Sequence, residues 1–113
     1  MKVFDVVEAY IIGRTEEVAD KYTVNEESLN ILGDYCGVID QIMNEWSGDG
    51  LDVDIVGENN LVVISITVSA MLMDIYHPQY FDLLDRAVAL AVCNTEENDL
   101  RMDFTFPSVW DKV

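Results

Sequence analysis

Hydrophobic side chains recur at helical spacing between residues 26 and 46. The apolar positions advance in steps of three and four residues, while polar residues fill the opposite side. The apolar positions are Leu29, Leu32, Tyr35, Cys36, Ile39, Ile42, Met43 and Trp46. This spacing predicts an amphipathic helix. Thr23 and Asn25 are both suited to cap its first turn, and the polar, glycine-containing stretch 47–50 predicts its end.

The amino-terminal segment, residues 3–22, fits two patterns. One helical face carries mostly apolar side chains: Val3, Val7, Tyr10, Ile11, Val18 and Tyr22. Against a helix, Ile12 falls on the polar side and Gly13 lowers helix propensity in the middle of the segment. We favour the helix. A strand over residues 3–12, followed by a short helix over residues 16–21, remains the competing prediction.

After residue 50 the hydrophobic period changes to two. Apolar residues alternate with polar ones over 51–55 and again over 62–70, and the stretch 57–60 has the composition of a hairpin turn. The pattern therefore predicts two antiparallel strands, and the second could run on, bent, as far as Tyr76. A further alternating run over 100–106, ended by Pro107, predicts a last strand.

His77 and Pro78 begin a third predicted helix, because proline is well suited to the first helical position. Its apolar face consists of Phe81, Leu84, Val88, Ala91 and Val92. The element order is then helix, helix, strand, strand, helix, strand. This order predicts a single α+β domain over residues 1–113, with helices packed on one face of a small, mainly antiparallel sheet.

The net charge of the chain limits the kinds of partner that it can bind directly. The chain has 22 acidic and 6 basic residues, which gives a net charge of −16, and 50% of its residues are hydrophobic. That apolar content argues for a folded chain rather than a disordered acidic tail. A negative protein is repelled by nucleic acid and by anionic membranes, so direct binding to either is not expected.

Catalysis, metal binding and cofactors are not expected from the motifs. His77 has no partner residue that marks it as a general base. The acidic stretch 49–54 lacks the ligand spacing of a calcium loop. A small enzyme is therefore the least favoured class. Cys36 and Cys93 each lie in a predicted helix, and we expect two buried reduced thiols, with a disulfide as the alternative.

A cytoplasmic location is expected from the amino terminus and the hydrophobic runs. Asp5 and Glu8 interrupt the apolar stretch that a secretory signal needs. No run approaches the length of a membrane-spanning helix.

Acidic residues on the polar faces are the candidate binding residues. They are Glu26, Glu27, Asp34, Asp40 and Glu45 on the predicted helix, and Asp52 and Asp54 on the first strand of the hairpin. Carboxylates three or four residues apart on a helix lie about 5–6 Å from one another, a spacing that could imitate part of a row of phosphates. In size and charge the chain resembles the DNA-mimic inhibitors of phage and mobile elements, which fill the cationic groove of a protein. That resemblance implies a non-catalytic domain with a basic protein partner.

A self-associating scaffold or assembly subunit is the alternative function, with acidity that serves only solubility. Tyr35, Trp46 and Trp110 would then form an apolar interface, and a homodimer is compatible with either role. Gly33 and Gly37 lie one helical turn apart. They indicate either the close approach of another segment, within the chain or from a partner, or simple tolerance at an exposed face.

Overall fold

A computed structural model describes residues 2–57, 59–71 and 78–113, with side chains described outside 78–81. It confirms a compact α+β fold. In chain order the elements are α1 (Val3–Glu17), β1 (Tyr22–Val24), α2 (Glu26–Glu45), β2 (Gly50–Val56), β3 (Leu61–Ser69), α3 (Pro78–Arg86), β4 (Ala89–Asn94), β5 (Asp99–Phe106) and β6 (Trp110–Lys112).

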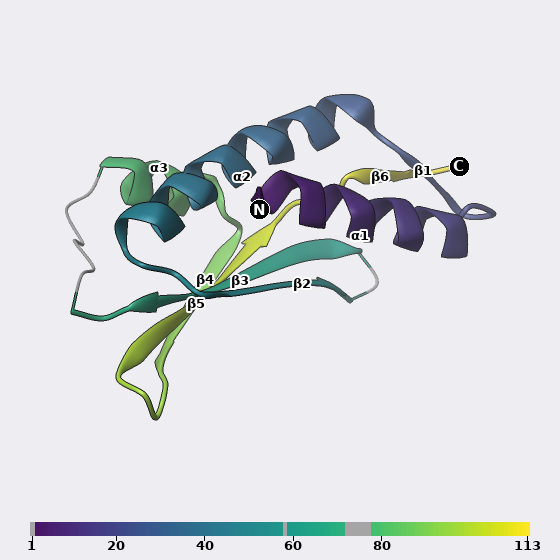
Figure 1. The fold of residues 1–113 in the computed structure, drawn as a ribbon. Coiled ribbons are helices and arrows are strands. Elements are labelled where there is room, and N and C mark those ends of the chain that lie inside the picture. The colour runs from purple at the N-terminus through teal and green to yellow at the C-terminus, as the bar shows by residue number, and fades with distance from the viewer. Residues whose placement is uncertain (1, 58, 72–77) are drawn as a thin grey trace.

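Four strands form the main sheet, in the spatial order β2-β3-β5-β4, and every neighbouring pair is antiparallel. In the register of the three strands β2, β3 and β5, Val53 lies opposite Ile64, which lies opposite Phe104. The helices lie on one side of this sheet, and the β4–β5 hairpin projects away from them (Figure 1). Strands β1 and β6 form a separate two-stranded sheet.

The core lies between the helices and the near face of the sheet. Its fully buried side chains include Val7, Ile11, Ile39, Ile42, Ile64, Ile66, Phe104 and Phe106. Burying a side chain of this size contributes about 1.5–3 kcal/mol relative to leaving it in water. The helices and the sheet therefore hold one another in place through a shared apolar layer.

The amino-terminal segment is a helix, so the competing strand over residues 3–12 is wrong. Val3, Val7 and Ile11 form its buried face, as the helical spacing predicts, and Ile12 is exposed. The helix ends at Glu17 rather than reaching residue 22. No side chain of its own caps its start. The carboxylate of Asp40 in α2 instead accepts a hydrogen bond from the Val3 N–H at 2.9 Å.

The second helix and the hairpin agree with the prediction. Asn25 caps α2, because its side-chain oxygen accepts a hydrogen bond from the Ser28 N–H at 3.1 Å. Strands β2 and β3 pair around the turn that follows Val56. The proposed continuation of the second strand toward Tyr76 lies beyond Met71, outside the described residues.

The third helix is shorter than predicted, and its second half is a strand. Helix α3 ends at Arg86, and β4 pairs with β5 so that Leu90 lies opposite Phe104. The run from Val88 to Cys93 is apolar at every position, so it satisfies a helical and an alternating period equally. Pairing with β5 decides between them. Cys93 is consequently exposed on a strand, and the prediction that it is buried in a helix is wrong.

Two strands were not predicted at all. Strands β1 and β6 have three residues each and pair Val24 with Trp110. Runs this short are too brief to display a period. They hold the carboxyl-terminal segment against the start of α2, where the Asn25 N–H donates to the Val109 carbonyl at 2.7 Å.

The two helix glycines have different surroundings. A Cβ at Gly33 would lie 3.1 Å from the Phe4 ring of α1, whereas a Cβ at Gly37 would meet nothing within 4 Å. Gly33 therefore permits close packing inside the chain, and Gly37 is a tolerated glycine.

We expect Gly37→Ala to raise the free energy of unfolding by about 1 kcal/mol, because alanine favours a helix and no neighbour must move. In Gly33→Ala the Phe4 ring has to shift, so the gain is smaller or becomes a loss. Urea denaturation of the two variants measures the difference. A Gly37→Ala variant that is less stable than Gly33→Ala contradicts this assignment.

Candidate protein-interaction surface

Among the described helices and strands, α2 carries the most acidic residues, and it has no basic one. Its twenty residues include five carboxylates and no lysine or arginine. Glu27, Asp34 and Glu45 are exposed and lie seven and eleven residues apart, which places them along one side of a helix with 3.6 residues per turn. We call these three residues the acidic α2 face. Glu26 is exposed beside it in the first turn.

Packing and capping hold the helix that carries the acidic α2 face in a fixed position. The opposite side of the helix is buried through Leu32, Cys36, Ile39 and Ile42. The cap at Asn25 fixes the first turn, and carboxylates in that turn are favoured by the positive end of the helix dipole. The carboxylates therefore project from a backbone that packing and capping hold in one position.

Asp40 does not belong to this surface. It is half-buried toward α1 and accepts the hydrogen bond from the Val3 N–H. It also contributes, after burial, to raising the pKa of the Cys36 thiol to about 12. Asp40 therefore joins the two helices, and the structure places it apart from the acidic α2 face.

Asp52 and Asp54 lie on a different part of the molecule. Both are exposed on β2, and α1 contacts both β2 and α2. Tyr10 of α1 reaches toward Asp54, with its hydroxyl 3.4 Å from the carboxylate. Each aspartate also accepts a hydrogen bond from the backbone N–H of the next residue, at 2.9 and 2.8 Å. The structure thus does not place them on the acidic α2 face.

An apolar spot adjoins the acidic α2 face. Ile31 lies between Glu27 and Asp34 in the helix and is 43% exposed. It lines a pocket of about 190 Å³ between α2 and the end of β5, together with Ser28, Leu32, Tyr35, Phe106, Pro107 and Ser108. The hydrophobic pattern indicates this spot only weakly, since Ile31 lies at the margin of the apolar stripe.

The three aromatic residues predicted as an apolar interface have other roles. Trp46 and Trp110 are only 2% and 5% exposed and belong to the core, so they offer no surface to a partner in this conformation. Tyr35 is half-buried and stacks on Phe106 at 5.0 Å, with the Arg86 guanidinium 5.5 Å from its ring centre. These contacts occupy much of its surface within the fold.

Most of the basic residues lie away from the acidic α2 face. Arg14, Lys21 and Lys112 line a pocket of about 430 Å³ where β1 and β6 meet the end of α1. Ion pairs join Arg14 to Glu17 at 2.8 Å, Arg86 to Asp82 at 3.1 Å and Arg101 to Asp103 at 3.0 Å. Lys2 shares a groove with Asp34 and Asp40, but within the described residues it forms no ion pair with either.

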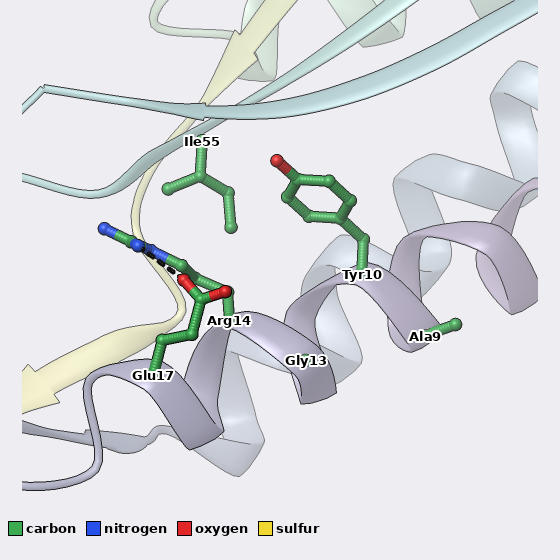
Figure 2. A pocket seen from close by; sticks show the side chains of 6 residues that line it. All are labelled: Ala9, Tyr10, Gly13, Arg14, Glu17 and Ile55. Atoms are coloured by element: carbon green, nitrogen blue, oxygen red, sulfur yellow. Dashed lines mark hydrogen bonds and ion pairs between the residues drawn. The ribbon is translucent and has the colours of Figure 1, made fainter.

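Another pocket lies between α1 and β2 and has a volume of about 370 Å³ (Figure 2). Tyr10, Arg14 and Ile55 point into it, and Arg14 is held by Glu17. Burial, and then the nearby Asp54 carboxylate, raises the pKa of the Tyr10 hydroxyl. Its six lining residues contain no nucleophile with an adjacent base, so they do not form the arrangement that nucleophilic catalysis uses.

The described residues contain no disulfide, no metal-binding cluster and no membrane-spanning helix. Both cysteines are free, with Cys36 buried and Cys93 exposed. No group of three or more His, Cys, Asp or Glu side chains in the described ranges is arranged to hold a metal ion. The helices that the structure describes are too short or too polar to cross a membrane. His77 lies outside the described residues.

Comparison with known proteins adds no relative. The chain matches no protein-family model, no curated protein and no solved structure.

Proposed function

We propose that this chain is a non-catalytic acidic domain that binds a basic protein through the acidic α2 face. The proposal is carried by the outer side of α2, where four of the five carboxylates of the helix are exposed and none of its twenty positions is basic. Because the helix is docked by its opposite side, the backbone that carries its carboxylates needs no ordering when a partner binds. Such preorganisation lowers the entropic cost of association.

A basic protein groove is the partner that fits this surface best. The net charge of −16 attracts a cationic partner over a distance and speeds encounter. A groove that normally holds DNA already presents lysine and arginine side chains in rows. The chain would then act as a DNA mimic, as the inhibitors of phage and mobile elements do, by occupying that groove in place of nucleic acid.

The apolar spot at Ile31 supports a protein partner. Interfaces between proteins combine an apolar centre with a polar rim. Here Ile31 is flanked along the helix by Glu27 and Asp34, next to a pocket with an apolar lining. Burying this side chain on binding would add stabilisation that salt does not screen.

Charge reversal on α2 tests the proposal. In Glu27→Lys/Asp34→Lys, we expect the affinity for a basic, histone-like DNA-binding protein to fall by roughly tenfold or more, because two attractions become repulsions. Fluorescence anisotropy of the labelled chain measures the binding at low salt. Far-ultraviolet circular dichroism establishes that the variant is folded, and both substituted side chains are exposed.

A matched control separates local recognition from net charge. Glu96→Lys/Glu97→Lys changes the same net charge at the exposed turn between β4 and β5, on the hairpin that projects away from the helices (Figure 1). We expect this variant to bind nearly as well as the natural chain. Equal losses in both double variants would mean that total charge, rather than the acidic α2 face, governs binding.

A scaffold that associates with itself is the second candidate function. It is favoured by one feature that the acidic surface does not explain, the uncharged edge of the main sheet. In that case the acidic residues would serve solubility.

A further inference from the structure

Strand β4 forms an edge of the main sheet. It is last in the order β2-β3-β5-β4, so among the described strands it pairs only with β5. One row of its backbone N–H and C=O groups therefore faces away from the sheet. Another β-strand is the partner that satisfies such a row completely.

This edge lacks the protection that edge strands usually have. Residues 87–95 contain no charged side chain, although 25% of the whole chain is charged. Val88 is 60% exposed and Val92 is 48% exposed. The opposite edge, β2, carries the exposed carboxylates of Asp52 and Asp54. Charges on an edge normally prevent pairing with another chain, so β2 is protected and β4 is not.

From this contrast we infer that β4 pairs antiparallel with β4 of a second copy of the chain. The pairing joins the two four-stranded sheets into one continuous sheet of eight strands about a two-fold axis. It requires no covalent step and no further component. The inference rests on the second candidate function, self-association, and names the strand that carries it; the acidic α2 face takes no part in it.

Charge identifies the second copy as the occupant. Two chains of −16 repel each other, so close approach costs least at a strand with no carboxylates of its own, and residues 87–95 are such a strip. A basic partner gains no attraction from this strip and is drawn to the carboxylates elsewhere. A two-fold axis places the strip against itself, as an isologous interface requires.

The side chains of β4 alternate between the two sides of the sheet in a way that is compatible with this pairing. Leu90 and Val92 lie in register with the buried Phe104 and Met102, and so on the helix side of the sheet. Ala89, Ala91 and Cys93 lie on the open side. Any antiparallel register that places residues of one side opposite each other keeps both layers continuous across the axis.

The association is expected to be weak and to strengthen with salt. A six-residue edge buries less than the ~800 Å² per partner of a standard interface. Added salt screens the repulsion between the two acidic bodies. Binding of a basic protein to the acidic α2 face has the opposite dependence on salt, so the two proposals fail independently.

Sedimentation equilibrium of the full chain, from micromolar to millimolar concentration, tests the pairing. We expect the weight-average mass to rise toward twice the monomer mass, and to do so at lower concentration in about 0.5 M than in about 0.05 M NaCl. Val92→Lys should weaken dimerisation by roughly tenfold or more, because lysine protects natural edge strands. The matched control is Val56→Lys, at an exposed valine of the opposite edge strand, which should dimerise like the natural chain.

Three outcomes overturn the inference. One is a natural chain that stays monomeric at millimolar concentration in high salt. Another is a folded Val92→Lys variant that dimerises as well as the natural chain. The last is an equal loss in Val92→Lys and Val56→Lys. Circular dichroism on each variant shows that a loss of mass does not arise from unfolding.

Discussion

The variant Trp110→Ala is expected to lose about 3–5 kcal/mol of its free energy of unfolding, a typical cost of removing a large buried aromatic side chain. Trp110 is only 5% exposed. Its indole N–H donates to the Thr15 hydroxyl of α1 at 2.7 Å, and that hydroxyl donates to the Ile11 carbonyl at 2.7 Å. The variant therefore loses apolar burial and the link between α1 and β6 together.

Urea denaturation followed by far-ultraviolet circular dichroism measures this loss, because the signal does not depend on the removed indole. Trp110→Phe is the control. It retains an aromatic ring and loses the hydrogen bond to Thr15, so its cost should be well below that of alanine, about 1–2 kcal/mol. A loss under 1 kcal/mol in Trp110→Ala would show that the carboxyl-terminal segment does not stabilise the helices.

The elements that the sequence predicted well are those with long periodic runs. Helix α2 shows its period over twenty residues, and the hairpin of β2 and β3 alternates on both sides of a recognisable turn. Local spacing is sufficient for such elements, because each buries one continuous face. The α+β class followed from their order.

The errors arose where tertiary contacts decide between local alternatives. The run from Val88 to Cys93 fits a helix as well as a strand, and only pairing with β5 makes it a strand. Strands β1 and β6 are three residues long and exist because distant segments meet. Neither fact is encoded in the spacing of nearby residues.

For the candidate site, too, local spacing predicted which side chains are exposed but not which distant residues they contact. Spacing along α2 placed Glu27 and Asp34 on the outer side, and the structure has both exposed. It could not reveal that Asp40 accepts a hydrogen bond from Val3, because the two residues are 37 positions apart. It also could not reveal that α1 packs against both β2 and α2, and that Asp52 and Asp54 on β2 lie outside the acidic α2 face.

We expect the chain to compete with duplex DNA for the same basic protein. If the acidic α2 face fills a cationic groove, the chain and duplex DNA must exclude each other from the same basic protein. We expect the chain to release a labelled duplex from a histone-like protein in about 0.05 M NaCl. We expect its own affinity to fall by roughly tenfold or more in about 0.3 M NaCl, because exposed charges are screened.

Anisotropy of the labelled duplex, followed while the unlabelled chain is added, measures this displacement. We expect the duplex to be released completely, and Glu27→Lys/Asp34→Lys to release far less of it than Glu96→Lys/Glu97→Lys. A ternary complex, in which the duplex stays bound while the chain binds as well, would show that the acidic α2 face does not fill the DNA-binding groove. So would release that is equally efficient with both double variants.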